Sequence, residues 1–126
     1  MTIQLHTVGV VVRNMGESLA FYRHLVLPVP EGQDAEDNVE AGLPNGITLG
    51  FLSEVVARQA DPTFTEPVSQ RINLQFACES AAEVDAIHTS LVAAGYISHT
   101  DPWDAYWGQR FARIKDADGN VVNLFA

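Results

Sequence analysis

The sequence contains one structural pattern twice, and this repeat restricts the possible folds more than any other feature. In each half, a strand rich in β-branched residues precedes a helix that opens with a capping box, and the half ends in a hairpin. The two boxes are Asn14 to Glu17 and Ser80 to Glu83. The two closing segments, Pro44 to Phe51 and Asp118 to Phe125, also look alike. A repeat of this length indicates two modules that bury a shared apolar surface.

The pattern predicts an α+β chain in which each module has one helix. Apolar residues at helical spacing place the first helix at about 15–25, and Gly95 is a good stop for the second. The expected strands are 3–12, 38–43, 47–52, 72–78, 96–100, 109–115 and 121–125. We expect a single domain, 1–126, with module 1 at about 1–53, a crossover at 54–70 and module 2 at about 71–126.

The composition favours a packed intracellular protein and excludes several classes. Hydrophobic residues make up 47% of the 126 residues, and Cys78 is the only cysteine, so no intramolecular disulfide can form. Seven basic residues against 16 acidic ones provide no basic patch for nucleic acid. The negative charge either attracts a cationic ligand or only keeps the protein soluble. The start of the chain lacks a secretory signal, and no apolar run could span a membrane, so we expect a cytoplasmic location.

The C-terminal stretch from Trp107 to Phe125 resembles the corresponding segment of bleomycin resistance proteins. The segment from Val8 to Asn14, and the pair Phe21 and Tyr22 in the first helix, also fit the vicinal oxygen chelate superfamily of glyoxalase I, extradiol dioxygenases and bleomycin resistance proteins. The resemblance covers nearly the whole chain. It implies two tandem βαβββ modules that form a cupped mixed sheet, and a homodimer with two clefts built partly from both chains.

The resemblance also implies where a metal would be held, because the enzymes of this superfamily use His and Glu side chains on the concave face of the sheet. The corresponding positions are Thr7, Leu49, Asn73 and Asn123. His6 is one residue too early and should point to the opposite face. Catalytic divalent cations prefer imidazole or carboxylate ligands. We therefore expect no metal, no cofactor and no catalytic residue of the usual kind.

Other residues capable of chemistry have simpler explanations. His24 and His88 are expected on helices and His99 on a strand, and no pair has metal-ligand spacing. The segment Asp116 to Asn120 slightly resembles a calcium loop, but the later glutamate is absent. A hairpin turn explains it better.

The best candidate for a ligand surface is an aromatic cluster. Trp103, Tyr106 and Trp107 lie within five residues of an expected loop and could stack against a flat ligand. By resemblance, Trp107 matches an aromatic residue that lines the drug groove of bleomycin resistance proteins. Trp103 could also have a structural role, in covering the core or a dimer contact. Arg110 could orient a ligand oxygen or pair with Asp104. Further residues expected to line the site are Phe51, Asn73, Gln75, Asn123 and Phe125.

Two functions follow from these features. The first is a non-catalytic protein of bleomycin-resistance type that sequesters an aromatic or cationic antibiotic, or a metabolite, in a cleft. The alternative is a glyoxalase-like or dioxygenase-like metalloenzyme with an atypical metal site. A nucleic acid or membrane partner is not expected.

Overall fold

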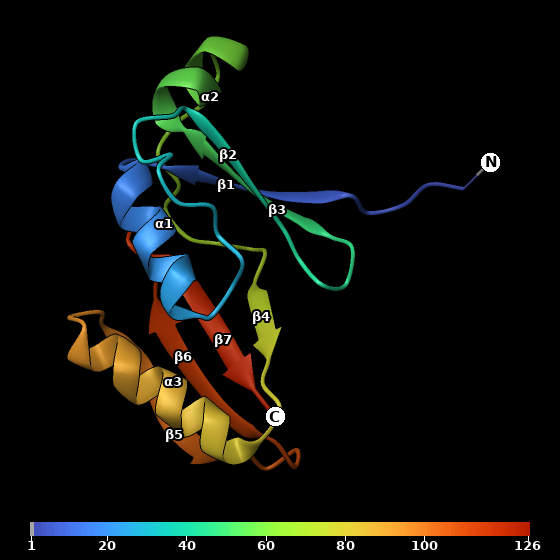
Figure 1. The fold of residues 1–126 in the computed structure, drawn as a ribbon, viewed down its shortest axis with the longest axis vertical. Coiled ribbons are helices and arrows are strands. Elements are labelled where there is room, and N and C mark those ends of the chain that lie inside the picture. The colour runs from blue at the N-terminus through green and yellow to red at the C-terminus, as the bar shows by residue number, and fades with distance from the viewer. Residues whose placement is uncertain (1) are drawn as a thin grey trace. The chain divides into compact units, whose positions relative to one another are not determined.

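The computed structural model describes residues 2–126 and divides the chain into two compact units, Met1–Glu66 and Pro67–Ala126 (Figure 1). Each unit packs helices with its own mixed β-sheet, so the α+β fold class is confirmed. Within the described residues the longest helix has 13 residues, and none is long and apolar enough to cross a membrane.

The first unit has a three-stranded sheet in the order β1-β3-β2. Strand β1 runs parallel to β3, and β2 runs antiparallel to it. Its elements are β1 (Thr7–Val12), α1 (Met15–His24), β2 (Asn38–Gly42), β3 (Thr48–Ser53) and α2 (Glu54–Ala60).

The core of the first unit lies between α1 and one face of this sheet. The register aligns Val10 and Val39 with Phe51 on the central strand, and alternation puts these three side chains on one face. Phe51 is fully buried, and its ring lies 5.2 Å from that of Tyr22 in α1. This aromatic contact fixes which face of the sheet the helix covers.

Helix α2 lies in the segment that the sequence predicts as an irregular crossover. The Ser53 hydroxyl caps it by accepting a hydrogen bond from the Val56 amide at 3.3 Å. Only Ala57 is buried in α2, so the helix has no apolar stripe that periodicity could reveal.

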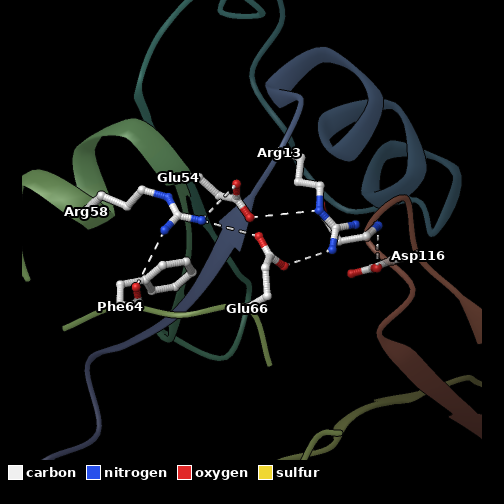
Figure 2. A network of polar contacts seen from close by, with 7 residues as sticks. Arg13, Glu54, Arg58, Phe64, Glu66 and Asp116 are labelled. Atoms are coloured by element: carbon white, nitrogen blue, oxygen red, sulfur yellow. Dashed lines mark hydrogen bonds and ion pairs between the residues drawn. The ribbon is translucent and has the colours of Figure 1, made fainter. Parts of the chain in front are cut away.

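Ion pairs connect α2 to the end of β1 and to the last residue of the first unit (Figure 2). Arg13 Nη2 donates to Glu66 Oε2 at 3.0 Å, and Arg58 Nη2 reaches Glu66 Oε1 at 3.4 Å. The hydrogen bond from Arg13 lowers the pKa of Glu66, whereas the neighbouring Glu66 raises the pKa of Glu54. The side chains of Arg13, Arg58 and Glu66 are about half exposed, so we expect the cluster to position the segment more than to stabilise it.

The second unit has a four-stranded sheet in the order β4-β7-β6-β5. Strand β4 runs parallel to β7, and the other pairs are antiparallel. Its elements are β4 (Leu74–Ala77), α3 (Ala81–Ala93), β5 (Ser98–Asp104), β6 (Arg110–Lys115) and β7 (Val121–Phe125).

The two sheets repeat one topology, but the first unit has one strand fewer. In each, the strand before the helix runs parallel to the last strand, which also pairs antiparallel with the strand before it. The first unit has no counterpart of β5, because the described residues 25–37 form no strand. Pro28 and Pro30 lie in this segment and cannot donate to a ladder. The first module is therefore βαββ rather than βαβββ.

Both helices begin where the capping residues predict. The Asn14 side chain accepts from the Glu17 amide at 2.9 Å, and the Ser80 hydroxyl accepts from the Glu83 amide at 3.1 Å. The helix ends differ. After α3, Gly95 has φ +100°, whereas after α1 the left-handed position is occupied by Val26 with φ +62°. A β-branched residue is strained in this region.

The turn between β6 and β7 is closed by one carboxylate. Asp116 Oδ1 accepts from the backbone amides of Asp118 and Asn120 at 2.9 and 2.8 Å, and Asp116 Oδ2 accepts from Asn120 Nδ2 at 2.9 Å. These bonds use oxygens that a calcium ion would need. The segment that resembles a calcium loop is thus a hairpin turn.

Candidate functional site

The two faces of the second sheet differ in chemistry. Helix α3 packs on one face, as the bond from Arg110 Nε to Asp85 Oδ1 of α3 at 2.8 Å shows. Alternation along β6 then directs Phe111, Arg113 and Lys115 to the opposite side. We call this opposite side the distal face.

Cross-strand register extends the distal face over all four strands as two rows. The aromatic row consists of Trp103, Phe111 and Phe125. The polar row consists of Thr100, Arg113, Asn123 and Gln75.

Trp107 joins the aromatic residues of this face into one cluster. Its ring lies 5.3 Å from Phe111, 5.5 Å from Trp103 and 4.9 Å from Tyr106, in each case close to perpendicular. Its Nε1 donates to Gln109 Oε1 at 2.7 Å, which fixes the indole orientation. Phe111 is buried, whereas Trp103 and Trp107 remain 37% and 44% exposed. The cluster therefore presents two indoles on a buried aromatic base.

Trp103 lies in β5 and not in a loop as the sequence predicts. Pro102 and the aspartates around it are typical of a loop, but β5 is an edge strand. The register shifts between Ser98, Thr100 and Trp103 accommodate the proline.

Arg113 is a cation on the distal face that sequence reasoning missed. Its Cζ lies 4.8 Å from the centroid of the Phe111 ring, and its Nη1 donates to Thr100 Oγ1 at 3.3 Å. No carboxylate among residues 2–126 forms an ion pair with it. Two-residue alternation with Phe111 along β6 was the signal that could have identified it.

Arg110 lies on the helix side of the sheet. It forms two bonds to Asp85, at 2.8 and 3.2 Å, and one to Asp104 at 3.2 Å. The hydrogen bond to Asp85 raises the pKa of Arg110. Of the two roles the sequence leaves open, pairing with Asp104 is the one observed, and Arg110 is not part of the distal face.

The remaining predicted residues of the second unit lie at the polar row or beside it. Asn123 is buried, and Gln75 next to it is exposed. Asn73 precedes β4 instead of lying within it, and its Oδ1 accepts from Gln70 Nε2 at 3.1 Å. Gln70 also pairs through its amide with the backbone of Val121, which replaces a ladder contact at the end of β7.

The predicted residues of the first unit are separated by its sheet. Phe51 and Leu49 face α1 and have almost no exposed surface, so Phe51 is a core residue and not a ligand wall. Thr7 points to the face away from α1, where it is the register partner of Thr48 and its methyl group lies beside Gly50. Leu49 is therefore on the wrong face to match Thr7 as a metal position.

The available donors do not fit a catalytic divalent cation. Thr7, Asn73 and Asn123 offer hydroxyl or amide oxygens, whereas such cations are held by imidazole or carboxylate. Within residues 2–126, no three or more His, Cys, Asp or Glu side chains are grouped to hold a metal ion. His6 Nδ1 lies 2.6 Å from the Thr7 hydroxyl and is otherwise exposed.

His88 is the one buried histidine among the described residues. Its Nε2 lies 2.8 Å from Ser98 Oγ, which donates to Asp101 Oδ1 at 2.6 Å. The serine proton is thus engaged, so the His88 nitrogen is the donor. Burial lowers the pKa of His88, against the nearby charges of Asp101 and Asp85. Because Ser98 donates to Asp101 and not to His88, the imidazole is not placed as a general base for this serine, and we assign His88 to packing.

The sequence and the fold were compared with known proteins. A family model described as the Glyoxalase/Bleomycin resistance protein/Dioxygenase superfamily matches residues 4–124. No protein with a curated description matches significantly. The fold is similar to hypothetical protein SA1046 from S. aureus, with a TM-score of 0.84 and 17% identity over 100% of this chain and 95% of that one. It is also similar to a glyoxalase/bleomycin resistance protein/dioxygenase family enzyme from Burkholderia phytofirmans, with a TM-score of 0.82 and 20% identity over 98% of both chains.

Proposed function

Since the chain belongs to the glyoxalase/bleomycin resistance protein/dioxygenase superfamily, we propose that it is a small-molecule binding protein whose ligand lies against the distal face of the second unit. The observation that carries this proposal is the aromatic cluster of Trp103, Trp107 and Phe111. Two partly exposed indoles, perpendicular to each other beside a buried phenyl ring, offer an apolar corner of fixed orientation, in which a planar ring can stack on one indole and meet the other with its edge. Such a surface suits a planar ring system.

The polar row supports binding more than catalysis. Thr100, Asn123 and Gln75 are neutral hydrogen-bonding groups that orient a ligand, and none of them is a general base at neutral pH. We therefore propose stoichiometric capture of an aromatic antibiotic or metabolite, without turnover. We also propose that two copies associate into a homodimer and that the two modules of each chain act as one domain.

Fluorescence titration tests the binding surface directly. The only two tryptophans of the chain both lie in the cluster, so a flat nitroaromatic quencher reports contact with it. We expect saturable quenching by neutral 4-nitrobenzyl alcohol. Affinity should fall about three- to tenfold in Trp107→Leu, since an aromatic contact contributes about 0.5–1.5 kcal/mol. Tyr96→Leu, at the end of α3, is the matched aromatic control and should bind normally.

The same titration with aromatic antibiotics tests the capture function, and elemental analysis of the purified protein separates it from the metalloenzyme alternative. Saturable quenching by an antibiotic with less than about 0.1 Zn, Ni, Mn or Fe per chain is the expected result. One equivalent of metal per chain without quenching by any aromatic compound would instead favour a metalloenzyme.

A further inference from the structure

Charge is sorted between the two faces of the second sheet. The helix side holds three carboxylates around Arg110 and His88, namely Asp85, Asp101 and Asp104. The strand residues on the distal face include two bases, Arg113 and Lys115, and no acid. A protein of formal charge -9 thus has a locally basic patch beside its aromatic cluster.

The two arginines of β6 differ in how many of their N–H donors have acceptors. Arg110 is saturated by three hydrogen bonds to two carboxylates. Arg113, three residues later and on the other face, has one hydrogen bond to a neutral hydroxyl and a ring beneath it. A guanidinium has five N–H donors that match an oxyanion in paired geometry. Arg113 therefore retains donors that are directed at no carboxylate within the described residues 2–126.

The cation and the indoles are close enough to touch one small molecule. The guanidinium of Arg113 and the indole of Trp107 both border the ring of Phe111, at 4.8 and 5.3 Å. Asn123 lies opposite Arg113 in the register and adds an amide donor. A ring placed on the indoles would thus have its substituent near two groups of donors.

We propose that the ligand of the distal face is an aromatic anion, a planar ring that carries a carboxylate or a similar oxyanion group. Its ring contacts Trp103 and Trp107, and its oxyanion accepts hydrogen bonds from Arg113. This inference rests on the proposed function and replaces a cationic ligand by an anionic one. The net negative charge of the protein opposes it little, since salt screens exposed charges beyond about 8 Å at physiological ionic strength.

Three matched quenchers test the sign of the ligand charge: 4-nitrobenzoate, 4-nitrobenzyl alcohol and 4-nitrobenzylammonium. We expect the wild-type protein to bind the benzoate about tenfold more tightly than the alcohol, and the ammonium most weakly. Arg113→Gln should remove the preference for the benzoate, so that the benzoate and the alcohol bind with similar affinity. Arg113→Lys should retain part of the preference, because it keeps the charge but not the paired donors. Arg110→Gln is the matched control and should keep the full preference.

The outcomes distinguish this inference from the proposed function. Equal affinity for the three compounds, or tighter binding of the ammonium, overturns the anionic ligand but not the binding surface. Quenching by none of the three overturns the proposed function itself. The Nε–H resonance of Arg113 in the unmodified protein provides a readout that needs no variant. It should shift on addition of 4-nitrobenzoate and stay in place with the alcohol, and a resonance that never moves contradicts the assignment.

Discussion

The helix-covered faces of the two sheets are built alike, whereas the faces away from the helices differ. In each unit the covered face holds fully buried apolar residues, such as Phe51 in the first and Ile114 in the second. On the face away from α1, β1 and β3 contribute small residues such as Gly9, Gly50 and Thr7. The distal face of the second unit instead has aromatic, cationic and amide groups. The covered faces are alike because each buries a helix, whereas aromatic, cationic and amide groups gather on the uncovered face of only one unit.

The largest effect is expected at Phe51, which we assign to the helix-covered face of the first sheet and not to a ligand surface. Phe51→Ala should lower the free energy of unfolding by about 3–5 kcal/mol, because it leaves a cavity against Tyr22. Urea unfolding followed by circular dichroism measures it. Trp107→Leu is the control, with a much smaller loss of stability and a large loss of binding. If Phe51→Ala lost little stability but no longer bound 4-nitrobenzyl alcohol, Phe51 would belong to the ligand surface.

The two arginines of β6 allow the same comparison within one strand. Arg110→Gln should lower the urea midpoint, by less than Phe51→Ala does, because Asp85 and Asp104 lose their shared partner. Arg113→Gln should change the midpoint less, since it breaks one bond to a neutral group. A larger loss in Arg113→Gln would show that the distal face is maintained for stability and not for a ligand.

The helix ends provide a smaller, reciprocal test. Val26→Gly gives α1 a glycine in the left-handed position, as Gly95 does after α3. The free energy of unfolding should rise by about 0.5–1 kcal/mol, because the relief of backbone strain exceeds the entropy cost of ordering a glycine. Gly95→Val imposes the strain on α3 and should lower stability. Thermal unfolding of both variants measures the pair. If the melting temperature of both variants were unchanged, the residue in the left-handed position would not affect stability at either helix end.

The smallest effect concerns the pH dependence of the helix side of the second unit. Because burial lowers the pKa of His88 below its ordinary value of about 6.5, the unfolded chain binds the proton more readily. This contribution to stability is present above pH 6.5 and is lost as the pH falls through the folded pKa. Melting temperatures between pH 7.5 and 5 should fall more steeply for the wild-type protein than for His88→Gln. Equal slopes would assign the acid sensitivity to other groups.

The sequence predicts those features of the fold that depend on interactions between residues close together in the chain. Asn14 and Ser80 cap helices over distances of three residues, and both helices begin where these residues place them. Helix α2 was missed because only Ala57 is buried in it. The prolines of the 25–37 segment, Pro28 and Pro30, are the sequence signal that marks the missing strand.

The candidate site was less predictable, because strand pairing and not spacing decides which residues share a face. Asn123 and Gln75 were expected together, and register aligns them. The sequence leaves Arg110 between a ligand oxygen and Asp104, because Asp85, its main partner, lies 25 residues earlier in a helix. Alternation groups Arg113 with Phe111 on one face of β6, but the position of α3 is needed to show that this face is the uncovered one.

The Asp116 turn helps to determine which of the two arginines of β6 lies on the distal face. Along a strand, odd and even positions exchange sides when the pairing moves by one residue. By binding two backbone amides, Asp116 sets how many residues the turn contains, and so which register β6 takes against β7. An insertion that moved this pairing by one residue would place Arg110 on the distal face, away from Asp85 of α3, and would place Arg113 on the helix side. The chemistry of the distal face is thus encoded partly in a turn between two strands.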